Sequence, residues 1–599
     1  MRRADAKDSW YGRKNQTGDG FAEVKTGVKG RIACGPPFFQ PIGNRLTWGD
    51  VLVNGFIRVR FSDGSEQQYA SGKTLLEIAA DRQACHASPI VAASVNNALT
   101  DLQSRQDTDA DVDFFDLSTG KGVKVYERSL TFVLIIAAER LFPGKDIVVE
   151  HSFGSGVYFE WLLDREVTEA DIRGLEQEME RIVEANLPLV RRNLPLAEAI
   201  RQLEALGDFR KVRLLRQIER DTVNLYECDG QLNYFYGPMV PETGYLKRFE
   251  LRFYPPGFIL RFPDATDSRI IPPFVDQPKL AQILQEAERW GELLGCPTVS
   301  ELNEAVMSDG FVELMRIAEA LHEKKVAEIA DRIADQRQQV KLVLIAGPSS
   351  SGKTTFAQRL GIQLRVHGIY PVPISLDDYF LDRDKTPRDA AGNYDFESIH
   401  ALDLPLFNEQ LVQLLAGRPV EPPRYNFKTG RREYPGKTLQ VGERHVLVVE
   451  GIHGLNPELT AAVPREQKLL IYISALTQLA IDGHNRIPTT DSRLLRRIVR
   501  DYQFRGHDAL QTLRMWPSVR NGEERYIFPF QEQADLMFNS ALIYELAVLR
   551  PYAEPPLSRI SPQEPEYLEA RRLIGFLRHF RSAPESLVPL NSILREFVG

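Results

Sequence analysis

The residues with the clearest chemical meaning form the run Gly347-Pro-Ser-Ser-Ser-Gly352-Lys353-Thr354. A glycine, four residues and then Gly-Lys-Thr is the spacing of a phosphate-binding loop. The apolar run LVLIA before it predicts a buried strand, and TTFAQRLGIQL after it predicts a helix. In such a loop the backbone amides point at the phosphates, and the helix N-terminus adds positive potential. We therefore predict an ATP site here.

Individual roles follow from this loop. Lys353 is predicted to neutralise the β- and γ-phosphates, and the hydroxyl of Thr354 to bind Mg²⁺. The predicted ATP-binding residues of the loop are Gly347, Ser349, Ser350, Ser351, Gly352, Lys353, Thr354 and Thr355.

The letters SGKT also occur at 71–74, and GKT occurs at 436–438. Where the pattern needs its first glycine, these runs have Gln67 and Arg431. Neither run fits a phosphate loop, and the copy at 71–74 is predicted to begin a helix.

Acidic residues follow two further apolar strands. The run PISLDDYF carries Asp377 and Asp378, and HVLVVEG ends in Glu450. A carboxylate at a strand end can accept the proton of a substrate hydroxyl, and we predict this role for Asp377. A helix cap or a ligand of Mg²⁺-bound water is the alternative. Glu450 is predicted to coordinate Mg²⁺.

An arginine cluster lies in DSRLLRRIVRDYQFRG. Its members are Arg493, Arg496, Arg497, Arg500 and Arg505. Arginines three or four residues apart share a helix face, which can close as a lid over transferring phosphates. A solvated basic face or an RNA-binding patch is the alternative.

These groups need elements that bring them together. The runs VKLVLIAG, YPVPISLDD, RHVLVVEG and KLLIYIS are apolar throughout and alternate with helical stretches. This pattern predicts an α/β fold with a doubly wound parallel sheet over 339–599, ending in a helical tail. Functional residues are expected at the carboxyl ends of such strands.

The rest of the chain divides into four predicted regions. Residues 1–55 are predicted to be a weakly ordered extension, because they are rich in Gly, Asn and Asp. The segment 56–118 alternates around DGS like a hairpin and predicts a small α+β unit. The segment 119–275 mixes helices and strands, and 276–338 predicts a helical connector.

Composition narrows the function classes. The 599 residues carry a net charge of −8, which makes a general nucleic-acid coat unlikely without excluding a local basic patch. The longest apolar run, LTFVLIIAA, is too short to span a bilayer, and the first residues lack the apolar core of a secretory signal. We expect a cytoplasmic protein without membrane partners. A homo-oligomer is left open.

Six motifs between 339 and 550 resemble the uridine kinase/phosphoribulokinase family of P-loop kinases. They are GPSSSGKTT, SLDDYF, NYDFES, PRYNFKTGRR, VVEGIHGL and RLLRRIVRDYQFRG. The resemblance implies an ATP- and Mg²⁺-dependent kinase that phosphorylates the 5′-hydroxyl of a ribonucleoside in nucleoside salvage, most closely uridine or cytidine. A kinase of another sugar, as in phosphoribulokinase, is the related alternative.

The resemblance also assigns site residues. Asp377 corresponds to the general base, Asp395 and Arg493 to the pair that holds the ribose hydroxyls, and Tyr425 and Phe427 to the lining of the base pocket. The predicted catalytic residues are Asp377, Lys353, Arg497 and Arg500, and the predicted lid contacts to ATP are Arg496 and Arg505.

Two departures from the family pattern affect these expectations. Gly430 stands where uridine-cytidine kinases usually have a histidine, so base preference and the choice of ATP or GTP as donor are left open. His507 stands where an arginine is usual in the lid.

The front half resembles the N-terminal part of threonyl-tRNA synthetase. The segment 56–118 is similar to its ubiquitin-like TGS domain, and 119–275 to its editing domain. The four positions that match the editing histidines and cysteine are Arg128, Phe132, Phe235 and Met239. These side chains lack the required lone pairs or nucleophile, so no editing and no metal are expected there.

Two function classes are therefore carried forward. The leading hypothesis is a nucleoside kinase. The rival is an RNA-linked P-loop ATPase or regulator in which the synthetase-like half recognises RNA.

Overall fold

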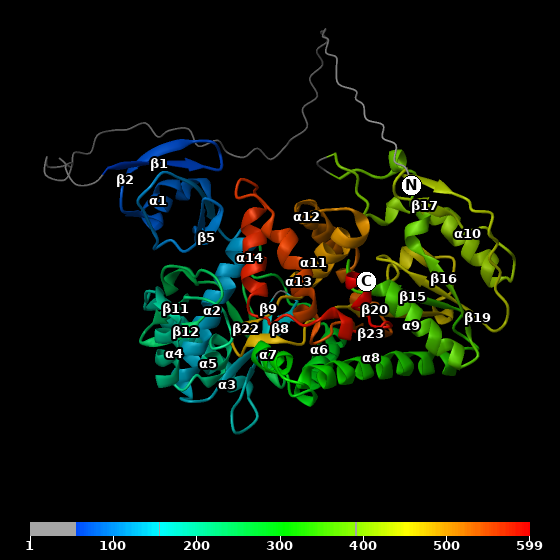
Figure 1. Ribbon diagram of the computed structural model, residues 1–599, viewed down its shortest axis with the longest axis horizontal. Helices are drawn as coiled ribbons and strands as arrows, with labels where there is room; N and C mark the ends of the chain where they lie inside the picture. Colours follow the sequence, from blue (N-terminus) through cyan, green and yellow to red (C-terminus); the bar gives the residue numbers. More distant parts are fainter. Residues whose placement is uncertain (1–54, 155, 390–391) are drawn as a thin grey trace, which may run out of the picture. The chain divides into compact units, whose positions relative to one another are not determined.

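The structure is a computed structural model that describes residues 55–154, 156–389 and 392–599. The predicted extension 1–55 lies outside the described residues apart from Gly55. The chain divides into the units Met1–Leu46 and Thr47–Gly599, and every described residue belongs to the second. Figure 1 shows this unit with its elements labelled.

The sheet of the C-terminal half has five strands in the order β16-β19-β15-β20-β23. All four neighbouring pairs are parallel. The strands are β15 Leu342–Ala346, β16 Tyr370–Ser375, β19 His445–Glu450, β20 Lys468–Ser474 and β23 Leu536–Asn539. The predicted doubly wound α/β fold of this half is confirmed.

Both faces of this sheet are buried, which explains why its strands are apolar throughout. Val343 and Ile345 of β15 belong to one hydrophobic cluster, and Leu342, Leu344 and Ala346 belong to another. Because alternate side chains point to opposite faces, each cluster covers one side of the sheet.

Helices cover both faces of the sheet and contribute side chains to these two clusters. Phe356, Leu360 and Leu364 of α9 pack on the first face together with α8, and Figure 1 shows α8 alongside α9. Phe407 and Leu411 of α10 cover the second face. The helices of this half are α9 Lys353–Val366, α10 Leu404–Leu415, α11 Thr489–Arg500, α12 Ala509–Tyr526, α13 Glu545–Ser558, α14 Tyr567–Leu577 and α15 Arg595–Val598.

Short strand pairs and three connecting helices complete the C-terminal half. The pairs are β17 Arg424–Asn426 with β18 Arg431–Glu433, and β21 Ala480–Asp482 with β22 Asn485–Arg486. The helices that precede the sheet are α6 Pro278–Leu293, α7 Val299–Met307 and α8 Gly310–Asp335.

The first part of the front half contains one helix and a five-stranded sheet, whose strands have the order β2-β1-β7-β4-β5. Its elements are β1 Phe56–Phe61, β2 Glu66–Ala70, β3 Lys73–Thr74, α1 Leu75–Arg82, β4 Ala92–Val95, β5 Ala98–Thr100, β6 Arg105–Gln106 and β7 Ala110–Phe115. Thr74 caps α1 and Glu77 completes a capping box. The SGKT copy at 71–74 therefore begins a helix, as predicted.

The second part of the front half has a four-stranded sheet, β13-β14-β9-β8, and a three-stranded sheet, β10-β11-β12. The elements are α2 Gly120–Leu141, β8 Ile147–Phe153, β9 Gly156–Trp161, α3 Glu169–Glu184, β10 Val190–Pro195, α4 Leu196–Ala205, α5 Phe209–Leu215, β11 Thr222–Cys228, β12 Gln231–Tyr234, β13 Glu250–Tyr254 and β14 Gly257–Arg261. Thr168 and Asp171 form a capping box at the start of α3.

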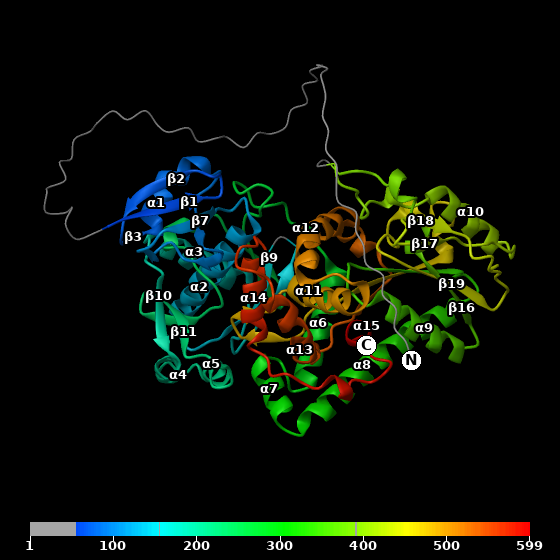
Figure 2. The ribbon, with the colours of Figure 1, turned by 45° about the horizontal axis from the view of Figure 1, so that its top comes forward.

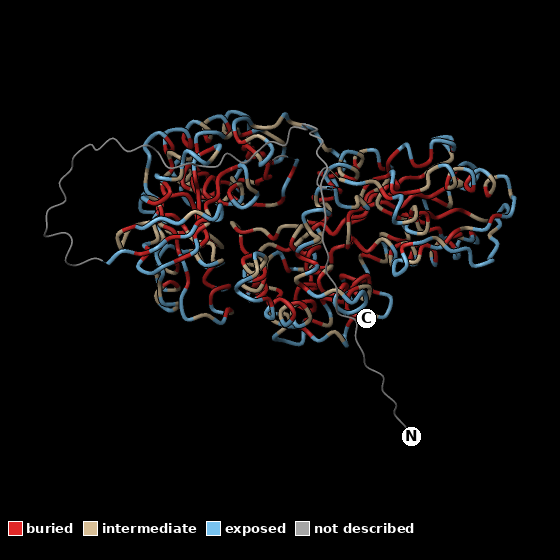
Figure 3. The backbone as a smooth tube through the Cα atoms, turned by 90° about the horizontal axis from the view of Figure 1, so that it is seen from above, coloured by how far each residue is buried: buried red, intermediate tan, exposed pale blue. Residues whose placement is uncertain are grey.

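The front and C-terminal halves contact each other through hydrogen bonds. The hydroxyl of Tyr234 lies 2.9 Å from the Nε2 atom of His579, and Arg220 donates to the carbonyl of Gly575 at 2.8 Å. The amide of Val149 donates to the carbonyl of Gly483 at 3.0 Å. Buried segments run through the interior of both halves (Figure 3).

Among the helices that the structure describes, none combines the length and the apolar composition that crossing a bilayer would require.

Candidate active site

The loop between β15 and α9 has the shape that its glycines predict. A Cβ atom on Gly347 would lie 1.9 Å from the carbonyl oxygen of Ile473, so this position accepts only glycine. Gly352 has a φ of 82°, in the left-handed region that favours glycine. The loop lies at the carboxyl end of β15, the central strand of the parallel sheet. Figure 2 shows β16, β19 and α9 of this half from a second direction.

The interior of this loop contains polar groups without partners. The buried hydroxyls of Ser350 and Ser351 have no hydrogen-bond partner among the residues that the structure describes. The Nζ atom of Lys353 lies 3.0 Å from the carbonyl of Gly347 and 3.1 Å from that of Pro348, and burial lowers the pKa of Lys353. An anionic ligand would satisfy these donors, which fits a phosphate site.

Asp377 and Glu450 are brought to the same sheet edge as Lys353. Ser375 and Glu450 are paired in register on β16 and β19, and the hydroxyl of Ser375 donates to Glu450 at 2.9 Å. Burial and then repulsion from Asp377 raise the pKa of Glu450 to about 7. Asp377 and Glu450 interact electrostatically, and Thr354 is exposed; carboxylate and hydroxyl oxygens are ligands that suit Mg²⁺.

Glu397 is a site residue that the sequence analysis missed. Burial raises its pKa to about 7, and it interacts electrostatically with Arg497, Glu523, Lys353 and Asp377. The motif NYDFES, which drew attention to Asp395, contains it. No sequence pattern indicates this role, because it depends on residues that are distant in the chain. Glu397 packs against Gly522, and a Cβ atom added to Gly522 would lie 2.3 Å from the Cβ atom of Glu397.

Arg493 forms a buried ion pair with Glu523. It is 1% exposed, and its Nη2 atom donates to Glu523 at 2.8 Å. It also donates to the carbonyl of Ser349 at 3.2 Å, and Glu523 accepts from the amide of Ser349 at 3.0 Å. The predicted contact between Arg493 and a ribose does not fit this conformation, because its guanidinium is enclosed by these partners.

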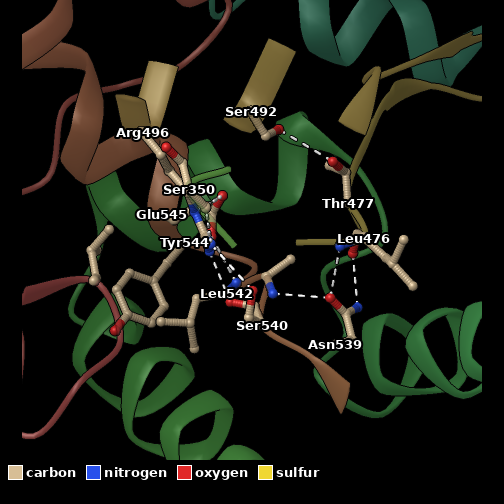
Figure 4. Close-up of polar contacts among 12 residues, drawn as sticks. Ser350, Leu476, Thr477, Ser492, Arg496, Asn539, Ser540, Leu542, Tyr544 and Glu545 are labelled. Carbon is tan, nitrogen blue, oxygen red and sulfur yellow. Dashed lines mark hydrogen bonds and ion pairs between the residues drawn. The ribbon is translucent and has the colours of Figure 1, made fainter. Parts of the chain in front are cut away.

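Arg496 supports the loop from outside (Figure 4). It is fully buried, donates to Glu545 at 3.2 Å and to the carbonyl of Ser540 at 2.8 Å, and approaches the carbonyl of Ser350 at 3.4 Å. The prediction that Arg496 binds ATP does not fit this conformation either. Loop amides face the phosphates, whereas Arg496 bonds to a loop carbonyl.

Three further arginines share one carboxylate. Arg497, Arg500 and Arg505 lie 3.2, 3.1 and 3.7 Å from Asp501, which is fully buried. Arg497 also donates to the hydroxyl of Ser349 at 2.7 Å, and burial lowers the pKa of Arg500 to about 10. Glu397 also interacts electrostatically with Arg497, and Glu596 with Arg500, so acidic and basic groups alternate beside the loop. This arrangement fits the predicted roles of Arg497 and Arg500, which stay predictions.

The C-terminal helix α15 contacts the start of α9. Glu596 accepts from the hydroxyl of Thr355 at 2.9 Å and from its amide at 3.4 Å. The Cγ2 atom of Ile593 would lie 2.7 Å from a Cβ atom on Gly352. In this conformation a carboxylate of the chain occupies donors that were predicted to bind ATP.

Aromatic rings form a wall beyond Asp377. Tyr425 lies 5.0 Å from Phe427 and 5.6 Å from Phe380 between ring centroids. Phe427 is 59% exposed, and the buried hydroxyl of Tyr425 has no partner. A flat base could stack on such a wall and use that hydroxyl. Asp395 lies in the segment that carries Glu397 and accepts from the amide of that residue at 3.2 Å.

The space beside Gly430 is filled by Arg383. Gly430 has a φ of 67°, and a Cβ atom there would lie 2.9 Å from the Nε atom of Arg383. Arg383 donates to the carbonyl of Phe427 at 2.8 Å. The exposed Arg383 therefore lies in the region where the kinase resemblance would place a histidine.

A phosphate-binding loop after the central strand of a parallel sheet defines the class of P-loop proteins. Residues 342–544 match the model of the Phosphoribulokinase / Uridine kinase family. The expected kinase-family resemblance of this half is confirmed.

Two solved structures cover similar parts of the chain. One is described as a possible uridine kinase from Bacillus stearothermophilus, with 21% identity and a TM-score of 0.23, covering 35% of this chain and all of that chain. The other is a D-glycerate 3-kinase from Cryptococcus neoformans, with 15% identity and a TM-score of 0.21, covering 42% of this chain and 87% of that chain.

The N-terminal part is similar to threonine–tRNA ligases. That of Syntrophomonas wolfei is 29% identical over 196 residues, which cover 33% of this chain and 31% of the relative. That of Bacillus subtilis is 29% identical over 200 residues, with the same coverage. The chain thus spans about a third of the length of these relatives. The expected synthetase resemblance is confirmed.

The four positions compared with editing residues lie close to a packed core. Phe132, Phe235 and Met239 are at most 2% exposed and belong to one hydrophobic cluster, with the rings of Phe132 and Phe235 5.4 Å apart. Arg128 donates to the carbonyl of Pro238 at 2.7 Å. The apolar packing explains these three substitutions, and absence of editing stays a prediction.

Proposed function

We propose that the protein is an ATP-dependent kinase that transfers the γ-phosphoryl group to the 5′-hydroxyl of a ribonucleoside. The observation that carries this proposal is the placement of Asp377 beside Lys353 and Glu450, where β16, β15 and β19 end. The aromatic wall of Tyr425 and Phe427 supports an acceptor with a flat base.

In the proposed reaction the acceptor oxygen attacks the γ-phosphorus while the bond to the β–γ bridging oxygen breaks. Asp377 accepts the hydroxyl proton, and ADP leaves. Lys353 and Arg497 stabilise the charge on the transferring group. Thr354 and Glu450 would hold Mg²⁺, which would supply positive charge to the transferring phosphate. The remaining contribution is positioning of the two substrates.

Nucleotide binding requires rearrangement of the loop. Lys353 now bonds to loop carbonyls, Glu523 to the amide of Ser349 and Glu596 to Thr355. Phosphate oxygens would replace these acceptors. We therefore infer that ATP competes with groups of the chain itself for these donors.

The acceptor class is proposed to be uridine- or cytidine-like, in keeping with the kinase domain. A second candidate is a sugar phosphate, and the observation that favours it is Arg383. This exposed arginine lies where the kinase resemblance would place a base-contacting histidine, and a guanidinium suits an acceptor phosphate.

A coupled ADP-release assay across a panel of nucleosides and ribulose 5-phosphate tests the proposal. Acceptor-dependent ADP release with one or more nucleosides is the expected result, and Lys353→Ala enzyme serves as the control for contaminating kinases. Release only with ribulose 5-phosphate would favour the second candidate. ADP release that no acceptor stimulates would contradict both.

A further inference from the structure

A second cavity lies between the synthetase-like half and the kinase domain. It has a volume of about 980 Å³ and is lined by α2, the segment after β12, β22, the start of α11 and α14. Asp377, Glu450 and the loop residues 347–354 are not among its lining residues. The cavity is therefore separate from the proposed catalytic groups.

The lining of this cavity is strongly cationic. Eight lysines and arginines line it, against three acidic residues. Arg493, Arg520 and Arg572 are neutralised in ion pairs with Glu523, Glu524 and Asp491. The remaining five cations have no carboxylate within ion-pair distance among the described residues: Lys124, Arg128, Arg220, Arg486 and Arg571. Of the three acidic residues that line the cavity, Glu127 forms no ion pair with any described residue.

Burial makes these charges costly without an anion. Burial is the main cause that lowers the pKa of Arg128 and of Arg486. Arg128 donates to the carbonyl of Pro238, and Arg220 to the carbonyl of Gly575, but neither partner is charged. An anionic ligand would supply the missing compensation.

The N-terminus of α11 adds uncharged hydrogen-bond donors to the lining of the cavity. Pro488 precedes this helix, and no side chain caps its N-terminus. Thr489 and Thr490 occupy its first two positions and line the cavity beside Arg486. Free amides at a helix N-terminus favour phosphate. Tyr236 and Phe528, both half-buried, line other parts of the cavity and suit a flat ring system.

We propose that this cavity binds a nucleoside phosphate, with the phosphate near Arg128, Arg486 and the start of α11 and the base against the aromatic residues. The volume suits a small ligand. The helix that begins at this cavity carries Arg493, Arg496 and Arg497, which bond to the phosphate loop. Occupancy of the cavity is thereby linked to the loop through one rigid element.

Binding to the full chain with Lys353→Ala tests this proposal, because that substitution weakens the loop site. Calorimetry with UMP and AMP should show one bound nucleotide per chain. The substitutions Arg486→Gln and Arg571→Gln should each weaken it about tenfold, the effect of losing one charge-assisted hydrogen bond. Arg571 is exposed, so its substitution is expected to leave the fold intact.

Arg181→Gln is the control, because Arg181 is an exposed arginine of the front half that lies outside the cavity. Uridine and inorganic phosphate are the two partial ligands, and each should bind more weakly than UMP. Equal binding of UMP and inorganic phosphate would overturn the nucleoside part of the proposal. No nucleotide binding, or binding of bulk tRNA alone that Arg486→Gln abolishes, would overturn it entirely. The readout needs no catalysis, so its failure is distinguishable from failure of the proposed kinase activity.

Discussion

The carboxylate of Glu596 accepts hydrogen bonds from both the hydroxyl and the amide of Thr355, at 2.9 and 3.4 Å. Thr355 follows the Gly-Lys-Thr of the phosphate loop, so the fourth residue from the end of the described chain occupies donors proposed for ATP. Two negative groups cannot share these donors. We therefore infer that the C-terminal helix would compete with the proposed nucleotide.

Replacing Glu596 should therefore strengthen nucleotide binding. A charge-assisted hydrogen bond contributes about 1–2 kcal/mol, so we expect Glu596→Gln to lower the Kd for ATP by about fivefold or more. Titration with a fluorescent ATP analogue measures the change. Glu564→Gln is the control, since Glu564 pairs with Arg514 on the same half. An unchanged or higher Kd in Glu596→Gln would show that the contact does not compete with ATP.

Asp377→Asn should remove turnover while it leaves ATP binding nearly intact. Loss of a general base costs roughly 10²–10⁴-fold in rate, and Asp377 is exposed, so the fold should tolerate the amide. Steady-state kcat and the ATP Kd, measured on the same preparation, separate the two effects. Asp384→Asn changes an exposed aspartate nearby and should retain activity. Wild-type turnover in Asp377→Asn would refute the assigned base.

Gly347→Ala should abolish ATP binding, because its Cβ would lie 1.9 Å from the Ile473 carbonyl oxygen and the loop would have to move. Gly436→Ala is a matched control from the third GKT run. Gly436 also needs a positive φ, 73°, but a Cβ there meets no atom within 4 Å. We expect a cost of about 1 kcal/mol in stability for Gly436→Ala and no change in ATP affinity. Thermal unfolding with and without ATP distinguishes the two variants.

Phe427→Ala should weaken binding of a nucleoside acceptor. The ring is 59% exposed and meets Tyr425 edge-on, so its removal costs stacking rather than core packing. A stacking loss of about 1 kcal/mol raises KM about fivefold and leaves kcat largely unchanged. Tyr434→Ala removes another exposed ring and is the control. Equal KM values for Phe427→Ala and the wild type would place the base elsewhere.

Glu150 gives the stability a pH dependence in the front half. Burial and then repulsion from Glu288 raise its pKa to about 8, from an ordinary value of 4.5. A carboxyl with a raised folded pKa stabilises the fold below pH 4.5, and this contribution is lost as pH rises through about 8. Glu150→Gln should therefore raise the free energy of unfolding at pH 9 by about 2 kcal/mol and change it little at pH 4.

Denaturant unfolding at both pH values measures this effect. Glu166→Gln replaces an exposed glutamate of the same half and should show no pH-dependent difference from the wild type. A Glu150→Gln variant that is less stable than the wild type at pH 9 would mean that the carboxylate is paired when charged.

The sequence predicted those features that depend on neighbouring residues. The loop at Gly347, the strand before it, the helix after it and the cap at Thr74 each follow from short spacings, and the structure has all four. Local backbone geometry determines such elements, so their residues identify them.

Contacts between distant residues were not predictable in the same way. Arg493 and Arg496 share a helix face with Arg497, as their spacing indicates, but Glu523 and Glu545 enclose the first two. The partners are 30 and 49 residues away. Spacing specifies which side chains share a face and gives no information about the acids that the fold brings to it. Glu397 and Glu596 escaped notice for the same reason.

One hydrophobic cluster contains residues of both halves. Leu203 and Leu225 of the synthetase-like half belong to the same buried cluster as Phe356 and Ile471 of the kinase domain. Each half therefore completes the interior of the other, and a cut between them would expose apolar surface to water. Although each half resembles a different family, the two now form a single unit of folding. Recombination that exchanged one half for a free-standing relative would have to rebuild that shared interior.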